Sequence, residues 1–216
     1  MKNKKLGFTL AEILIALAVI GIAAAMTIPI LMQNIGEQQY KSAWKNTYAA
    51  VVSAATLIAN DNSGTLKDVF TNGSNMQTTF LGKLNYVKSC DNNVEGNCWS
   101  SGWKNYVGTA ATSLGTTVPG AVLSNGAYVV FGWTTKDCST VDGLGAFDCG
   151  SIYVDVNGST NPNRAGKDIF RLHVQSGGII PYGATNGTGV TDGYDCGDSG
   201  TAPHGLGCSA LYLSAT

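Results

Sequence analysis

The feature that most constrains this chain is an apolar segment close to its start. From Phe8 to Met32 the sequence contains 25 residues with a single charged side chain, Glu12. A helix needs about 20 apolar residues to cross the hydrocarbon core of a bilayer, so the segment predicts a membrane-spanning helix. An uncompensated carboxylate inside such a helix costs about 3 kcal/mol. Glu12 is therefore expected to serve a function and to meet a positive partner.

A short basic stretch precedes the apolar segment. Lys2, Lys4 and Lys5 stand within the first six residues. Basic residues beside a membrane helix remain on the cytoplasmic side. The expected topology places the start of the chain inside the cell and the remainder outside.

The residues Gly7-Phe8-Thr9-Leu10-Ala11-Glu12, behind this lysine-rich leader, resemble the prepilin signal of type IV pilins and type II secretion pseudopilins. The resemblance implies that a membrane-embedded prepilin peptidase cuts between Gly7 and Phe8 and methylates the new N-terminus of Phe8. It also implies an inner-membrane assembly platform, an assembly ATPase, and identical or related pilin subunits as partners. The resemblance further implies that the subunit lies in the inner membrane of a bacterium before assembly and in an extracellular or periplasmic filament afterwards.

The charges around the expected cleavage point agree with this resemblance. A cut after Gly7 creates an ammonium group on Phe8 in apolar surroundings, where Glu12 offers the opposite charge. Removing one partner of a buried ion pair costs roughly 3 to 5 kcal/mol. In the family, the glutamate is thought to meet the terminal amine of a neighbouring subunit and to set the register of the filament.

Two simpler interpretations compete with a prepilin. Ala23-Ala24-Ala25 imitates the small-residue cleavage site of a conventional secretory signal, which would release a disulfide-rich secreted domain. The same segment also suits a plain membrane anchor. Neither interpretation explains why Gly7 and Glu12 occur together.

The charge balance argues against nucleic acid as a partner. Of 13 Lys and Arg residues, three lie in the leader, which leaves 10 against 14 Asp and Glu in the remaining chain. A nucleic-acid-binding domain would show a basic patch or stripe. A mildly acidic extracytoplasmic domain is expected instead.

The cysteines indicate an oxidising compartment. All six follow the apolar segment, and an even number in an extracytoplasmic domain favours disulfides. Six cysteines allow 15 connectivities, but three close pairs suggest three local bonds. A zinc-thiolate site is the alternative, although the sequence has no Cys-x-x-Cys spacing. The pairs are Cys90 with Cys98, Cys138 with Cys149, and Cys196 with Cys208.

Helical periodicity continues beyond the apolar segment, and one helix is predicted from about Phe8 to Ala59. Its second half carries an amphipathic face, on which the aromatic residues are expected to be core and not ligand-binding. The face comprises Tyr40, Ala43, Trp44, Thr47, Tyr48, Val51, Ala55 and Ile58. The chain thus divides into a leader, residues 1–7, a transmembrane and filament-core helix, residues 8–32, its amphipathic continuation, residues 33–60, and a globular head, residues 61–216.

The head is expected to be a small antiparallel sheet with disulfide-bonded loops. A short helix is predicted near Met76–Leu84. Asn125-Gly126 between two apolar runs is a strong hairpin signal. Strands are predicted at Ala121–Leu123, Ala127–Trp133, Ser151–Val156, Ile169–Val174 and Gly178–Pro181. A long helix packed on such a sheet is an α+β fold, which the pilin resemblance also implies.

A loop rich in oxygen-bearing side chains follows one predicted strand. Asp155 and Asn157, with Asp168 further along, offer hard oxygen ligands to Ca²⁺, and Gly158 permits a sharp bend. Several pseudopilins resemble this loop in holding calcium. The bidentate glutamate of an EF-hand is absent, however, and an Asx-stabilised turn between strands is the favoured interpretation.

Catalysis is not expected. Gly197-Asp198-Ser199-Gly200 imitates the surroundings of a serine protease nucleophile, but neither His173 nor His204 is placed convincingly as its base. Asp155 and Asp168 form a conceivable acid and base pair, yet no pocket for a substrate accompanies them. The sequence therefore predicts a structural subunit without catalytic residues, of either a pilus or a pseudopilus.

Overall fold

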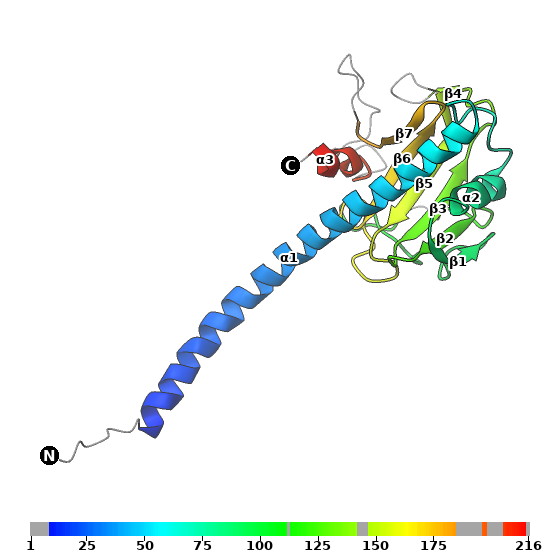
Figure 1. The fold of residues 1–216 in the computed structure, drawn as a ribbon. Helices are drawn as coiled ribbons and strands as arrows, with labels where there is room; N and C mark the ends of the chain where they lie inside the picture. Colours follow the sequence, from blue (N-terminus) through cyan, green and yellow to red (C-terminus); the bar gives the residue numbers. More distant parts are fainter. Residues whose placement is uncertain (1–8, 112, 142–146, 185–195, 198–204, 215–216) are drawn as a thin grey trace. The chain divides into compact units, whose positions relative to one another are not determined.

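The structure, a computed structural model, describes residues 9–111, 113–141, 147–184, 196–197 and 205–214, and only the backbone of 29–35, 141 and 147. The chain divides into two compact units, Met1–Gln39 and Tyr40–Thr216. The second is called the head unit below. One helix, α1, runs from Leu10 to Asp61 and contributes to both units (Figure 1).

The long helix predicted from the sequence is confirmed. It ends at Asp61, two residues later than expected, while the expected start at Phe8 lies outside the described residues. Its end is formed by a turn in which Gly64 has a φ of +85° and donates its backbone N–H to Ala59 O at 2.8 Å. Glycine adopts this left-handed conformation without steric cost, which makes it a common helix terminator.

The head unit contains an antiparallel sheet in the order β1-β2-β3-β5-β6-β7, with β4 paired to β5. Sequential strands are mostly neighbours, and short turns join β2 to β3 and β6 to β7, whereas longer connections join β1 to β2 and β5 to β6. The strands are β1 Tyr86–Cys90, β2 Gly120–Leu123, β3 Tyr128–Trp133, β4 Thr140–Val141, β5 Phe147–Asp155, β6 Ile169–Gln175 and β7 Gly178–Pro181. The α+β class predicted from the sequence is confirmed.

The predicted hairpin joins β2 and β3. Asn125 Oδ1 accepts the backbone N–H of Ala127 at 3.1 Å, and Gly126 has a φ of +87°. Both features are expected of an Asn-Gly turn. The predicted strands at Ile169 and Gly178 also correspond to β6 and β7, whereas β5 begins at Phe147, earlier than predicted.

The short helix α2 spans Gly73–Leu81, so the predicted range Met76–Leu84 was shifted by three residues. The reason is an N-cap: the Asn72 side chain accepts the backbone N–H of Asn75 at 2.9 Å and starts the helix early. The strands β1 and β4 and the helix α3, Cys208–Ser214, were not predicted. The side chains of β1 are mostly exposed, which explains why no apolar pattern marked it.

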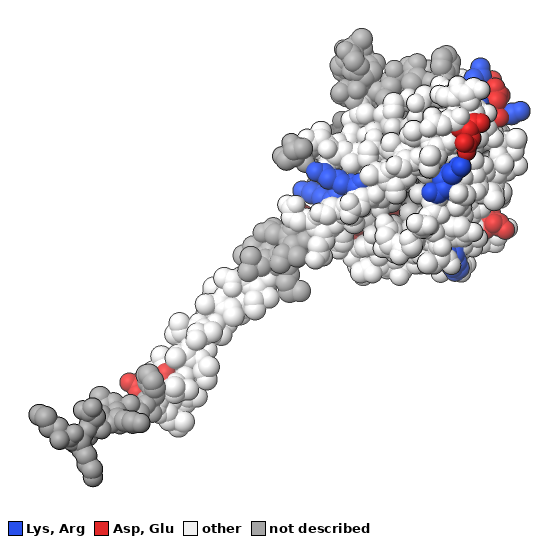
Figure 2. All heavy atoms as spheres, viewed as in Figure 1, with Lys and Arg blue, Asp and Glu red and all other residues white. Residues whose placement is uncertain are grey.

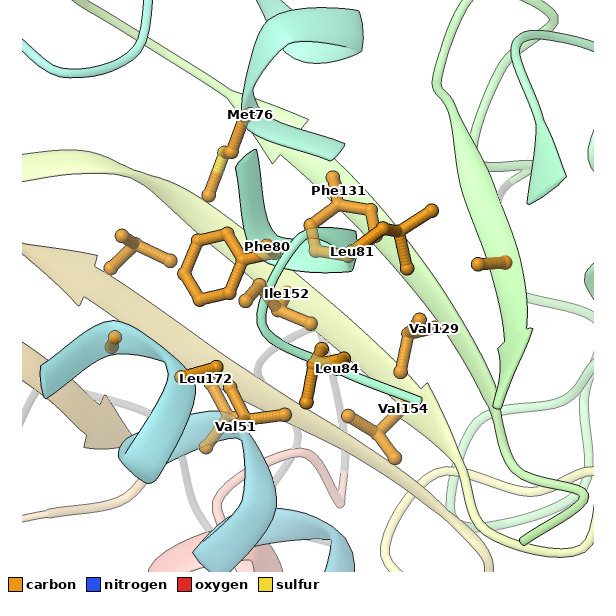
Figure 3. Packing of buried hydrophobic residues seen from close by; sticks show 14 of the residues in the cluster. Val51, Met76, Phe80, Leu81, Leu84, Val129, Phe131, Ile152, Val154 and Leu172 are labelled. Carbon is orange, nitrogen blue, oxygen red and sulfur yellow. The ribbon is translucent and has the colours of Figure 1, made fainter. Parts of the chain in front are cut away.

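One hydrophobic core lies between the helices and one face of the sheet. The second half of α1 buries Trp44, Thr47, Val51 and Ile58 at helical spacing, as its amphipathic face predicts. Figure 3 shows side chains from α1, α2 and the sheet packed together in this core. The labelled side chains there are Val51 from α1, Met76, Phe80 and Leu81 from α2, Leu84, and Val129, Phe131, Ile152, Val154 and Leu172 from the sheet.

A second hydrophobic cluster covers the opposite face of the sheet. Strand alternation places Val130 of β3 and Ile169 of β6 on this face. Trp99 and Trp103, from the long connection between β1 and β2, pack edge-on against Tyr153 of β5, with ring centroids 6.3 and 6.2 Å away. The central strands β3, β5 and β6 are therefore covered on both faces.

Candidate functional site

The start of α1 is formed by Thr9 and Glu12. The backbone N–H and the hydroxyl of Thr9 donate to Glu12 Oε2 at 2.8 and 2.7 Å, and Glu12 N–H donates to Thr9 Oγ1 at 3.3 Å. This reciprocal arrangement is a capping box, in which a Thr before the helix and a Glu three residues later satisfy each other's backbone donors. The carboxylate thus has a partner in its own chain.

This capping role of Glu12 was not predicted from the sequence, where the carboxylate stood out only as a misplaced charge that needs a cation. The signal was present, because Thr9-Leu10-Ala11-Glu12 matches the Thr-x-x-Glu pattern that begins many helices. A helix start without caps leaves backbone donors unpaired, which is costly where water is scarce.

The helix that follows the capping box is long and apolar enough to cross a membrane. The qualifying segment is Leu10–Ile28, judged by length and composition. Figure 2 shows this segment almost entirely white, with acidic atoms only near its beginning. Gly7 and Phe8, the predicted cleavage residues, lie outside the described residues.

The structure brings Asp155 and Asp168 together in the head unit. Both side chains are fully buried. Asp155, at the end of β5, accepts the Ser100 hydroxyl at 3.0 Å and Asn157 N–H at 3.3 Å. Asp168 accepts the backbone N–H groups of Asn163 and Arg164 at 2.7 and 2.6 Å. The bond from Asn157 to Asp155 forms an Asx turn, as favoured from the sequence, while Asp168 fixes the backbone of the same loop at Asn163 and Arg164.

The electrostatics of this carboxylate pair are unfavourable to two negative charges. Burial, followed by the neighbouring charge of Asp168, raises the pKa of Asp155 to about 8. Burial also raises the pKa of Asp168, although the N–H groups of Arg164 and Asn163 oppose this shift. Within the described parts of the chain, no lysine or arginine forms an ion pair with either carboxylate.

The donors of this loop are compatible with a hard cation. Asn157 Oδ1 is buried and has no hydrogen-bond partner among the described residues, and the Asn157 side chain also interacts with Asp168. Carboxylate and amide oxygens are the ligands that Ca²⁺ prefers. Among the described residues, no cluster of three or more His, Cys, Asp or Glu side chains is arranged to hold a metal ion. Carbonyl or amide oxygens would therefore have to complete the coordination of Ca²⁺.

The Asn163 side chain lies among further oxygens of the same loop. With its amide oriented to donate, Asn163 Nδ2 lies 2.9 Å from Ser100 Oγ, 3.1 Å from both Gly158 O and Thr160 O, and 3.3 Å from Asp155 Oδ2. An amide has two hydrogens for these four acceptors. The loop is therefore rich in oxygen acceptors and poor in donors.

The residues considered for catalysis do not form a described site. Ser199 and His204 lie outside the described residues. His173 on β6 is 2% exposed, and its Nδ1 lies 3.0 Å from Asp148 Oδ2. The His173 ring stacks on Tyr182 with centroids 3.9 Å apart. This histidine packs against Tyr182 of the second hydrophobic cluster and is shielded from bulk solvent.

The cysteines form three local disulfides, as their spacing predicted. The first disulfide joins the end of β1 to the connection that follows it, and the second joins the segment after β3 to β5. The third joins Cys196 to Cys208, the first residue of α3. The pairs are Cys90–Cys98, Cys138–Cys149 and Cys196–Cys208.

Comparison with known proteins identifies the N-terminal segment. Residues 2–28 match the family model described as the prokaryotic N-terminal methylation motif. No curated protein and no solved structure matches the chain. The matched segment contains Gly7, Phe8 and the Thr9–Glu12 capping box. The chain therefore carries the prepilin signal of type IV pilins and pseudopilins at its start, followed by an α+β head unit.

Proposed function

We propose that the chain is a structural subunit of a type IV pilus or of a type II secretion pseudopilus. The observation that carries this proposal is the methylation motif over residues 2–28. In this proposal a prepilin peptidase removes residues 1–7, and the mature helices pack side by side in a filament. Identical or related subunits, an assembly platform and its ATPase are the other partners.

The geometry at the start of α1 supports a link between processing and assembly. Cleavage after Gly7 places the new amine on Phe8, directly before the capping box of Thr9 and Glu12. The carboxylate is held at the helix end where this positive charge arises. In the assembled filament, we propose that Glu12 pairs with the Phe8 amine of a neighbouring subunit. That pairing compensates a charge that hydrocarbon would otherwise disfavour.

The proposed topology keeps the basic leader in the cytoplasm and exports the head unit. Its three disulfides suit an oxidising compartment. Before assembly the subunit would reside in the inner membrane through the segment that contains Leu10–Ile28. Afterwards it would belong to an extracellular or periplasmic filament.

N-terminal sequencing of the mature protein, isolated from cells with and without prepilin peptidase, tests this function. We expect a chain that begins at N-methylated Phe8 only when the peptidase is present. A chain that begins at Met26 would instead indicate a conventional secretory signal. A chain that retains its leader in both strains would indicate a simple membrane anchor.

We also propose that the carboxylate loop binds Ca²⁺. Asp155, Asp168 and Asn157 would hold the ion. Support comes from the two buried carboxyl groups, which form no ion pair with a lysine or arginine in the described part of the chain, and from Asn157 Oδ1, which has no hydrogen-bond partner there. A bound divalent ion would neutralise the pair and stabilise the folded head unit by mass action.

A further inference from the structure

Three basic residues lie close together at one end of the head unit. Lys104, from the connection between β1 and β2, pairs with Arg164 in an isolated β-bridge and donates its backbone N–H to Asn163 O at 2.8 Å. Lys167 lies one turn further along the β5–β6 connection, where its backbone N–H donates to Arg164 O at 3.1 Å. Lys104, Arg164 and Lys167 are called the basic surface below.

The positive charges of the basic surface are not neutralised by the residues around them. Lys104 is exposed, and Arg164 and Lys167 are half-buried. None of the three forms an ion pair in the described part of the chain, and Arg164 Nη2 donates to a neutral group, the carbonyl oxygen of Tyr106. The nearby Asp168 is fully buried and accepts backbone N–H groups instead of a basic side chain. The basic surface therefore presents excess positive charge to its surroundings.

The basic surface lies at the end of the head unit that α1 enters. Tyr40 is the first residue of this unit along the chain. Its hydroxyl donates to Asn161 O at 3.3 Å, and Asn161 precedes Arg164 by only three residues. The loop that carries Arg164 and Lys167 is thus fixed to the beginning of the head segment of α1.

The length of chain between the apolar segment and Tyr40 is short. The apolar segment ends at Met32, eight residues earlier, and α1 is helical throughout, which corresponds to about 12 Å. The headgroup region on each side of a bilayer is about 5 to 8 Å thick, and charges act over about 8 Å at physiological ionic strength. The one carboxylate of this connection, Glu37, has Lys41 four residues later as a counterpart.

We propose that the basic surface binds the headgroups of anionic phospholipids while the subunit resides in the inner membrane. Lipid phosphates accept hydrogen bonds from guanidinium and ammonium groups, and each basic residue beside an anionic lipid surface strengthens the attraction about fivefold. The contact holds the entry end of the head unit against the membrane. This inference rests on the proposed membrane topology but not on filament assembly.

Lysine labelling of the full chain in nanodiscs tests the contact. The discs contain phosphatidylcholine alone or with about 30% phosphatidylglycerol, and mass spectrometry measures how fast a water-soluble acylating reagent modifies each lysine. Phosphatidylglycerol should slow the modification of Lys104 and Lys167 at least about threefold, and about 0.5 M salt should abolish the difference. Labelling rates of Lys104 and Lys167 that do not respond to phosphatidylglycerol would overturn the proposal.

Lys136 provides an internal control. It is exposed, and its carbonyl oxygen accepts the N–H of Asp68 from the connection that follows the other end of α1. Its labelling rate should differ by less than about 1.5-fold between the two kinds of disc, because this end of the head unit lies beyond the screening length. Equal slowing of all three lysines would mean a general effect of the lipid charge and would contradict a specific contact.

Charge reversal locates the contact. In discs with phosphatidylglycerol, Lys167→Glu should restore the labelling rate of Lys104 to within about twofold of the rate in phosphatidylcholine, whereas the matched Lys136→Glu should leave Lys104 protected. Thermal unfolding checks that each variant is folded. Full protection of Lys104 in a folded Lys167→Glu protein would contradict the proposal. If Lys167→Glu does not fold, the converse variant Lys104→Glu, at an exposed position, decides the question with Lys167 as the reporter.

The same experiment separates this inference from the proposed function. Retention of the chain in the discs reports on the membrane segment, and the N-terminal sequence reports on processing. A chain that inserts into both kinds of disc but shows no effect of phosphatidylglycerol on its lysines would refute the lipid contact and leave the filament role standing.

Discussion

At the scale of single residues, Glu12 combines two roles that require different properties of its side chain. The capping box with Thr9 requires only an acceptor at the end of α1. Pairing with the Phe8 amine, as we propose, requires a negative charge. A neutral isostere therefore separates the two roles.

Glu12→Gln should retain the cap and lose the charge, because glutamine also serves in capping boxes. We expect normal membrane insertion and cleavage after Gly7, with filament yield reduced at least about tenfold. Immunoblots of sheared filaments and of whole cells measure the two quantities. Thr9→Val is the converse control, since it removes the hydroxyl and keeps the charge of Glu12. Normal filaments from Glu12→Gln would contradict the proposed pairing.

At the scale of elements, the turn between β5 and β6 is flanked by two buried carboxyl groups, those of Asp155 and Asp168. The elevated pKa of Asp155, about 8, means that the folded chain holds a proton which the unfolded chain has lost above about pH 4. The folded state then binds more protons than the unfolded state. Its stability must fall as the pH rises through this range.

Without divalent cations, the midpoint of thermal unfolding should therefore decrease between about pH 4 and pH 8. Asp155→Asn should flatten this dependence, because an amide does not titrate. Asp91→Asn, at an exposed position, serves as the matched control and should follow the wild-type chain. An Asp155→Asn protein with the full wild-type pH dependence would show that this carboxyl group does not govern the effect.

Calcium should act on the same element in the opposite direction. At about pH 7.5, added Ca²⁺ should raise the unfolding midpoint of the wild-type chain, and a chelator should reverse the change. Asp155→Asn should respond much less than Asp91→Asn. A wild-type midpoint that Ca²⁺ leaves unchanged would support the hydrogen-bonded turn alone.

At the scale of the whole molecule, Trp44 joins three elements of the head unit. It is fully buried on α1, stacks on Phe170 of β6 with centroids 4.5 Å apart, and donates its Nε1 to Ser209 O of α3 at 3.0 Å. One side chain thus connects a helix, the sheet and the C-terminal helix. Its loss would affect packing and hydrogen bonding together.

Trp44→Ala should lower the free energy of unfolding of the head unit by about 3 to 5 kcal/mol, the usual cost of deleting a buried large aromatic side chain. Leu57→Ala, on the same helix but 49% exposed, should change it by less than about 0.5 kcal/mol. Denaturant unfolding of the full chain in micelles compares the two. Similar effects of both substitutions would mean that Trp44 does not anchor these elements.

Sequence patterns were informative wherever the structural cause is local. The run of apolar residues predicted the membrane segment, helical spacing predicted the buried face around Trp44, and Asn125-Gly126 predicted a hairpin. The close spacing of cysteines predicted three disulfides, each of which closes a short loop. Local signals failed for β1, whose exposed side chains show no apolar alternation.

By itself, the sequence determined the prepilin signal, the long helix and the α+β class, because these depend on residues near one another along the chain. Only the tertiary structure decided what surrounds the functional side chains. Asp155 and Asp168 are 13 residues apart but share one buried site, and Trp99 and Trp103 reach Tyr153 of β5 from the connection between β1 and β2. The burial of these groups arises from packing between segments that are distant in the sequence, which no local pattern records.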